Sequence, residues 1–93
     1  MPEISDGLII VAKRDCPTCV LLEPVYRELA QSGVALAVYS QDDPSFPTTI
    51  AGVIDDTALE ISDRLDIETV PTLIRMSGGE EIARIVEIVK HYG

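Results

Sequence analysis

The stretch LIIVAKRDCPTC, residues 8–19, joins a run of branched apolar side chains to a pair of closely spaced cysteines. Its first part, residues 8–12, is continuously apolar, which is typical of a parallel strand covered on both faces. Pro17 fits the first turn of a helix, because that turn does not use its backbone N–H. The sequence therefore predicts a strand over 8–12 and then a helix over about 16–31. The helix face that packs on the sheet carries the apolar residues at helical spacing, Leu22, Val25, Tyr26 and Leu29.

A second apolar run, Val34–Tyr39, follows this helix. Gly33 suits the end of the helix, because glycine adopts left-handed backbone angles without a side-chain clash. A strand, a helix and a second strand in this order form a parallel unit. Between residues 41 and 56, aspartates and prolines indicate a loop, while the apolar run 50–54 is either buried or strand-like and stays unassigned.

The second half of the chain predicts a short helix and a hairpin. Thr57-Ala58-Leu59-Glu60 matches a capping box, in which the Thr hydroxyl and the Glu carboxylate satisfy backbone donors, so a helix is expected over 58–65. Residues 72–76, a Ser-Gly-Gly turn at 77–79 and residues 81–88 are typical of an antiparallel hairpin. The last segment also fits a helical face, but the Gly-Gly turn favours a strand.

Composition and charge exclude several classes of protein. The chain has 93 residues, of which 46% are hydrophobic, and this predicts one domain over residues 1–93. A formal net charge of -9 at pH 7 repels phosphate backbones and anionic lipid, so neither nucleic acid nor a membrane is an expected partner. The first residues carry acids where a signal peptide carries positive charge, and no apolar run is long enough to span a bilayer. We therefore expect a cytoplasmic protein.

The two cysteines are the candidate catalytic residues. At the start of a helix, Cys16 faces backbone N–H groups and positive dipole density, which favour the thiolate over the thiol. Cys19 lies one helical turn later and can attack a mixed disulfide formed on Cys16. Lys13 and Arg14 favour a lower thiol pKa while Asp15 opposes them, so the sequence leaves this balance open.

The chain resembles the thioredoxin superfamily. The resemblance rests on the strand before Cys16-Pro17-Thr18-Cys19, on Pro24 where members of the family often carry a helix-kinking proline, and on Thr69-Val70-Pro71-Thr72. It implies an α/β, thioredoxin-like fold with a mixed central sheet and flanking helices. It also implies that the Val70–Pro71 bond is cis, that Pro71 lies against the cysteine pair and shapes the substrate groove, and that Val70 pairs its backbone with an extended substrate.

Several residues depart from the family pattern. Asp15 precedes the motif where thioredoxins have Trp, and Pro17-Thr18 is closer to glutaredoxins. The buried acid that assists proton transfer in thioredoxins falls near Ile10, so this chain lacks that base. Little chain remains after the last strand for the usual C-terminal helix. An uncovered apolar sheet face is costly in water, so a second copy, a partner or a further domain is expected to cover it.

Other interpretations of the polar residues are weaker. A cysteine pair alone also fits half of a zinc site or two inert core thiols, but a closed zinc site needs four ligands and the chain offers two cysteines and one histidine. No metal site is predicted, and His91 is expected at the surface. The acidic pairs at 42–43 and 55–56 are expected to be solvated or to cap helices.

The sequence thus predicts a thiol–disulfide oxidoreductase, a small thioredoxin-like reductant with no cofactor. The expected partners are a protein disulfide as substrate and an electron donor, either a reductase or glutathione. Use of glutathione fits the Pro17-Thr18 dipeptide but is disfavoured by the net negative charge. The alternative is a non-catalytic binding module, or a domain of a larger redox protein, whose groove holds a partner.

Overall fold

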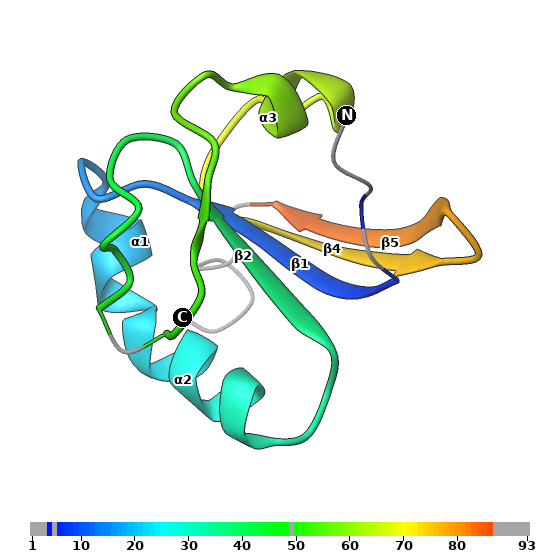
Figure 1. The fold of residues 1–93 in the computed structure, drawn as a ribbon, viewed down its shortest axis with the longest axis horizontal. Helices are drawn as coiled ribbons and strands as arrows, with labels where there is room; N and C mark the ends of the chain where they lie inside the picture. Colours follow the sequence, from blue (N-terminus) through cyan, green and yellow to red (C-terminus); the bar gives the residue numbers. More distant parts are fainter. Residues whose placement is uncertain (1–3, 5, 49, 87–93) are drawn as a thin grey trace.

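The computed structural model describes residues 4, 6–48 and 50–86. A five-stranded sheet in the order β3-β2-β1-β4-β5 forms its centre. Strands β1, β2 and β3 run parallel, whereas β4 is antiparallel to both β1 and β5. Helices α1 and α2 lie on one side of this mixed sheet and α3 on the other (Figure 1). The strands are β1 (Gly7–Ala12), β2 (Leu36–Ser40), β3 (Ile54–Asp55), β4 (Thr72–Ser77) and β5 (Glu80–Val86).

Strand β1 is buried on both faces, as its continuous apolar sequence predicts. Ile10 and Ala12 belong to the core cluster that also holds residues of α1 and α2. Ile9 and Val11 belong to the second cluster, on the side of α3. Successive side chains of a strand point to opposite faces, so both layers need apolar residues from β1. The sheet therefore holds the end of β1, where the cysteine motif begins, in a fixed position.

The predicted helix over 16–31 is two helices. Helix α1 covers Pro17–Leu21 and α2 covers Glu23–Gln31, with a break at Leu22. Pro24 explains the break, because proline has no N–H and its ring clashes with the carbonyl four residues earlier in a continuous helix. The chain bridges the break with bonds from the Leu22 N–H to the Thr18 carbonyl, at 3.1 Å, and from the Val25 N–H to the Leu22 carbonyl, at 2.9 Å.

The predicted capping box is wrong. Helix α3 covers only Glu60–Arg64, and Leu59 at its N-cap has a left-handed backbone, with φ 60°. The Asp56 carboxylate caps the helix instead of Thr57: it accepts the N–H groups of Ile61 and Ser62, each at 2.9 Å, and the Ser62 hydroxyl at 2.6 Å. A carboxylate with two oxygens accepts several donors at once, whereas a hydroxyl satisfies one or two.

Other elements differ from the prediction at their ends. In the run 50–54, Ala51 and Gly52 are exposed, and only Ile54–Asp55 forms a strand. The second strand begins at Leu36 instead of Val34. The hairpin has its turn at Gly78 and Gly79, as predicted.

Three predictions fall wholly or partly outside the described residues. They are the end of the hairpin at 87–88, the position of His91 and the lack of a C-terminal helix. Within the described part of the chain, no helix has the length and apolar character to cross a membrane.

Candidate functional site

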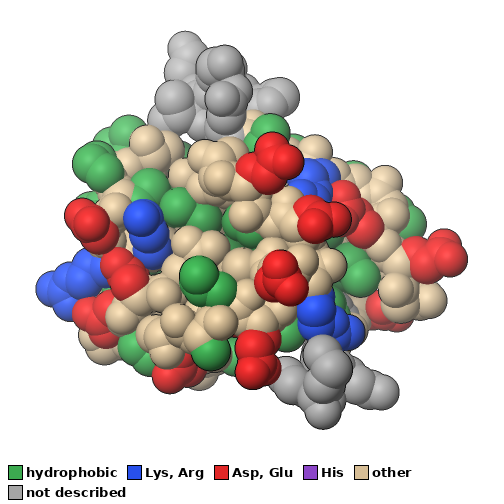
Figure 2. All heavy atoms as spheres, turned by 90° about the horizontal axis from the view of Figure 1, so that it is seen from above, with side chains coloured by type: hydrophobic (Ala, Val, Ile, Leu, Met, Phe, Trp, Pro, Cys, Tyr) green, Lys and Arg blue, Asp and Glu red, His purple; other side chains and the backbone are tan. Residues whose placement is uncertain are grey.

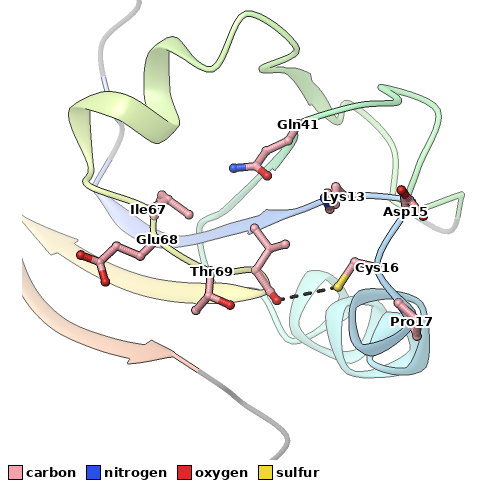
Figure 3. A pocket seen from close by; sticks show the side chains of 9 residues that line it. Lys13, Asp15, Cys16, Pro17, Gln41, Ile67, Glu68 and Thr69 are labelled. Atoms are coloured by element: carbon pink, nitrogen blue, oxygen red, sulfur yellow. Dashed lines mark hydrogen bonds between the residues drawn. The ribbon is translucent and has the colours of Figure 1, made fainter.

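Cys16 is the N-cap residue of α1. Its backbone is extended, with φ -154° and ψ 106°, and its Sγ accepts the Cys19 backbone N–H at 3.2 Å. The thiol in turn points at the Val70 carbonyl oxygen, 3.7 Å away (Figure 3). An acceptor at the N-cap satisfies a backbone donor that the helix leaves free, and a negative charge there is favoured by the helix dipole. The Cys16 sulfur thus accepts one hydrogen bond from the start of the helix and donates one to the Val70 carbonyl.

Asp42 holds the segment that precedes Cys16. Its carboxylate accepts the Arg14 N–H at 2.7 Å and the Asp15 N–H at 2.9 Å. Although burial acts to raise it, the pKa of Asp42 is lowered by these two N–H groups. Asp42 is exposed, as predicted, but its carboxylate also binds two backbone N–H groups, because the loop after β2 brings it beside the loop after β1.

Asp43 pairs with Arg14. The Nη1 of Arg14 lies 2.7 Å from the Asp43 Oδ2. Hydrogen bonds from the Ser45 side chain and from Arg14 lower the pKa of Asp43 to about 2. The Arg14 guanidinium is thus engaged by a carboxylate, which limits its effect on the cysteines.

Cys19 lies beneath Cys16 and has no exposed surface. Both cysteines are free thiols. Burial, followed by the hydrogen bond with Cys16, raises the pKa of the Cys19 thiol to about 12. Cys19 packs in the same core cluster as Ile10 and Tyr26. The two thiols therefore differ strongly: Cys16 is partly exposed, while Cys19 is buried and held in its neutral form.

Val70 and Pro71 adjoin the cysteines. The Val70–Pro71 peptide bond is cis. Pro71 is fully buried, so Val70, and not the proline ring, forms part of the accessible surface beside Cys16. The Thr72 hydroxyl donates to the Thr69 carbonyl at 2.7 Å and holds the turn. Within the described residues, no hydrogen bond uses the Val70 N–H. The structure thus brings Cys16, Cys19, Val70 and Pro71 together.

A cavity of about 430 Å³ opens beside Cys16. Gln41 reaches it from the end of β2, and its Nε2 donates to the Ser62 hydroxyl at 2.8 Å, which itself donates to Asp56. Gln41, Ile67 and Glu68 were not predicted as part of the site. The available signal was the position of Gln41 directly after a parallel strand, since the carboxyl ends of parallel neighbours share one edge. The lining residues are Lys13, Asp15, Cys16, Pro17, Gln41, Ile67, Glu68, Thr69 and Val70 (Figure 3).

Apolar surface lies on the other side of Cys16. Val20 and Leu21 are 49% and 68% exposed, and they border a second hollow together with Pro17 and Cys16.

Among residues 4, 6–48 and 50–86, no group of three or more His, Cys, Asp or Glu side chains has an arrangement that holds a metal ion.

No family model and no curated protein matches this chain. A solved structure does: the crystal structure of reduced Schistosoma mansoni thioredoxin pre-protein, with a TM-score of 0.61 and 22% sequence identity. The match covers 94% of this chain and 74% of that one. The prediction of a thioredoxin-like α/β fold with a mixed sheet and flanking helices is thereby confirmed.

Proposed function

We propose that this chain is a thiol–disulfide oxidoreductase in which Cys16 attacks and Cys19 resolves. One observation carries the proposal: Cys16 is a partly exposed N-cap residue in the wall of a cavity, and a second, buried thiol lies directly beneath it. Disulfide exchange requires an accessible sulfur that attacks as the thiolate, and Cys16 is the accessible sulfur of the pair. The thioredoxin-like fold supports the same function.

The reaction has two displacement steps. The Cys16 thiolate attacks one sulfur of the substrate disulfide, forms a mixed disulfide and releases the other substrate sulfur as a thiolate. The Cys19 thiol then loses its proton to solvent, and its sulfur attacks the Cys16 Sγ. The bond between Cys16 and the substrate breaks, and the second substrate thiolate leaves. The substrate gains two electrons, and the protein ends with a Cys16–Cys19 disulfide.

The substrate in this proposal is a protein disulfide in an extended segment. The Val70 N–H makes no hydrogen bond to the described residues, and this supports the proposal, because an extended peptide beside it gains a backbone hydrogen bond. The oxidised pair returns to the dithiol by exchange with an electron donor, a reductase or glutathione. The chain has only two cysteines and both are free, which fits a reductant in a reducing compartment such as the cytoplasm.

Reduction of insulin disulfides by dithiothreitol tests the proposal. The wild-type chain is expected to accelerate the reaction, and Cys16→Ser to give the rate of dithiothreitol alone. Cys19→Ser is the matched control: it retains the attacking thiol and should accumulate a mixed disulfide that mass spectrometry detects. Equal rates for wild type and Cys16→Ser would contradict the proposal.

The second candidate is a non-catalytic binding module. The exposed apolar pair Val20 and Leu21, next to Cys16, favours it, because such a surface suits the docking of a partner. A binding module predicts that Cys16→Ser leaves all activity of the chain unchanged, so the insulin assay separates the two candidates.

A further inference from the structure

The Tyr26 hydroxyl is a buried polar group without a hydrogen-bond partner in the described structure. Tyr26 is 1% exposed. Buried hydroxyls are almost always paired, so one that is not calls for an explanation. The oxidoreductase reaction as derived above makes no use of it.

The position of Tyr26 relates it to the cysteine pair. Tyr26 lies on α2, beyond the break at Leu22 that separates α2 from α1, the helix that carries Cys19. Tyr26 and Cys19 belong to one buried cluster, together with Ile10 and Ala12 at the end of β1. The phenol ring thus packs in the same buried cluster as Cys19, and Cys16 packs against that cluster.

The hydroxyl keeps its proton in this environment. Burial raises the pKa of Tyr26 well above its usual value, and negative charge on Cys19, Cys16 and Glu23 raises it further. A group that stays protonated donates a hydrogen bond and does not act as a base. The two sulfurs are the largest electrostatic influences on Tyr26 after burial itself.

The resolving step needs such a donor. Cys19 attacks only as a thiolate, yet its pKa is raised to about 12, chiefly by burial. Ile10 is 1% exposed in the same cluster and offers neither a base nor a donor. Hydrogen bonds to an ionised group are roughly twice as strong as those between neutral groups. A hydroxyl that has no partner while Cys19 is neutral can therefore form a new, charge-assisted hydrogen bond once Cys19 ionises.

We propose that Tyr26 is a positioning residue whose hydroxyl donates a hydrogen bond to the Cys19 sulfur as this thiol ionises. The inference rests on the proposed function and concerns its second step only. The Cys19 proton passes to solvent, the Cys19 sulfur forms the bond to the Cys16 Sγ, the substrate thiolate leaves, and Tyr26 retains its own proton throughout. The bond increases the fraction of Cys19 present as thiolate and so accelerates resolution.

Reaction with dithiobis(nitrobenzoate) in a stopped-flow instrument separates the two steps. The attack of Cys16 releases one coloured thiolate, and resolution by Cys19 releases the second. Tyr26→Phe is expected to leave the first release unchanged and to slow the second about tenfold, the factor for one unit in the pKa of Cys19. Tyr39→Phe is the matched control: this tyrosine is also buried, but in the cluster on the other side of the sheet, and both releases should keep their wild-type rates.

The stability of Tyr26→Phe to urea supplies a second readout. Because the hydroxyl is unpaired, its removal should not lower the urea midpoint. An unchanged second release would overturn the inference, as would an equal slowing of both releases together with a lower midpoint, which indicates a purely structural role. Absence of the first release from the wild-type chain would instead overturn the proposed function itself.

Discussion

Asp42 binds both amide groups of the segment that leads into Cys16, at 2.7 and 2.9 Å. These bonds tie the loop after β1 to the loop after β2, and so they fix the approach of the chain to the α1 N-cap. No short-range pattern reveals this, because Asp42 and Cys16 are far apart in the sequence. The acidic pair was predicted to be solvated or to cap helices; Asp42 is exposed, and its bonds to the two amides are the part that was not predicted.

Asp42→Ala is expected to slow the attack of Cys16, because the Arg14 and Asp15 amides lose their acceptor and the cysteine loses its fixed geometry. A several-fold decrease in the first release from dithiobis(nitrobenzoate) is expected. Asp43→Ala is the control: it removes the Arg14 ion pair and two hydrogen bonds from Ser45 in the same loop, but it leaves the Arg14 and Asp15 amides their acceptor. If the Asp42 variant reacts at the wild-type rate, the amide bonds do not position Cys16.

The same two aspartates predict a pH dependence of stability. The pKa of each is lower in the folded chain than the ordinary value of 3.8, and that of Asp43 is about 2. Their contribution is therefore fully present above the ordinary carboxyl pKa and is lost as the pH falls through the folded values. Urea unfolding between about pH 4 and pH 2 should show a shallower loss of stability in the double variant Asp42→Asn, Asp43→Asn than in the wild type. Parallel curves would contradict this.

At the scale of elements, helix α3 depends on one buried carboxylate. Asp56 is 3% exposed and accepts three hydrogen bonds from the start of the helix. Asp56→Ala should lower the free energy of unfolding by about 2 kcal/mol or more, because buried donors lose their acceptor. Thr57→Ala, at the residue where the capping box was predicted, should change it by less than about 0.5 kcal/mol. Urea denaturation measures both changes in the free energy of unfolding. A larger loss for Thr57→Ala than for Asp56→Ala would show that Thr57 caps the helix, as the capping box predicts.

Strand β1 meets the chain before β2 at Gly7. A Cβ there would lie 2.6 Å from the Ala35 carbonyl oxygen, and φ is +115°. Gly7→Ala therefore combines backbone strain with a clash against backbone atoms. Gly33→Ala is the matched control, with φ +87° and no atom within 4 Å of the added carbon. Thermal unfolding should show a clearly larger fall in Tm for Gly7→Ala than for Gly33→Ala. Equal falls would show that the contact with Ala35 does not destabilise the Gly7 variant.

Three local signals predicted their elements well, whereas the local capping box at Thr57–Glu60 did not. The apolar run of β1, the cysteine spacing and the Gly-Gly turn each specify their structure from a few neighbouring residues. The break at Leu22 was not predicted as a helix end, because Pro24 was treated as a kink. Capping by Asp56 and the part played by Gln41 in the cavity both depend on contacts between segments distant in the sequence, which periodicity and propensity do not report.

At the scale of the whole molecule, charge is expected to affect which disulfides react in the proposed exchange. The surface on the α3 side of the sheet carries more acidic than basic side chains (Figure 2), and the formal net charge of the chain is -9. The cavity beside Cys16 adds Asp15 and Glu68 against one lysine, Lys13. Long-range attraction raises the encounter rate with cations and is screened by salt.

A peptide disulfide flanked by lysines should therefore react several-fold faster than the same peptide flanked by glutamates at low ionic strength. The difference should shrink as salt is added, and second-order rate constants for the two peptides measure it. Equal rates for the two peptides at low salt would show that the negative electrostatic potential of the protein does not select substrates.

The reduction potential of the Cys16–Cys19 pair tests the central claim most directly. The chain is equilibrated in glutathione buffers of graded ratio, trapped with acid and an alkylating reagent, and the fraction of intramolecular disulfide is read by mass spectrometry. The account predicts a single two-electron transition at a potential near that of thioredoxin, about -270 mV. It would be contradicted by two cysteines that never form a disulfide with each other, or that each carry glutathione independently.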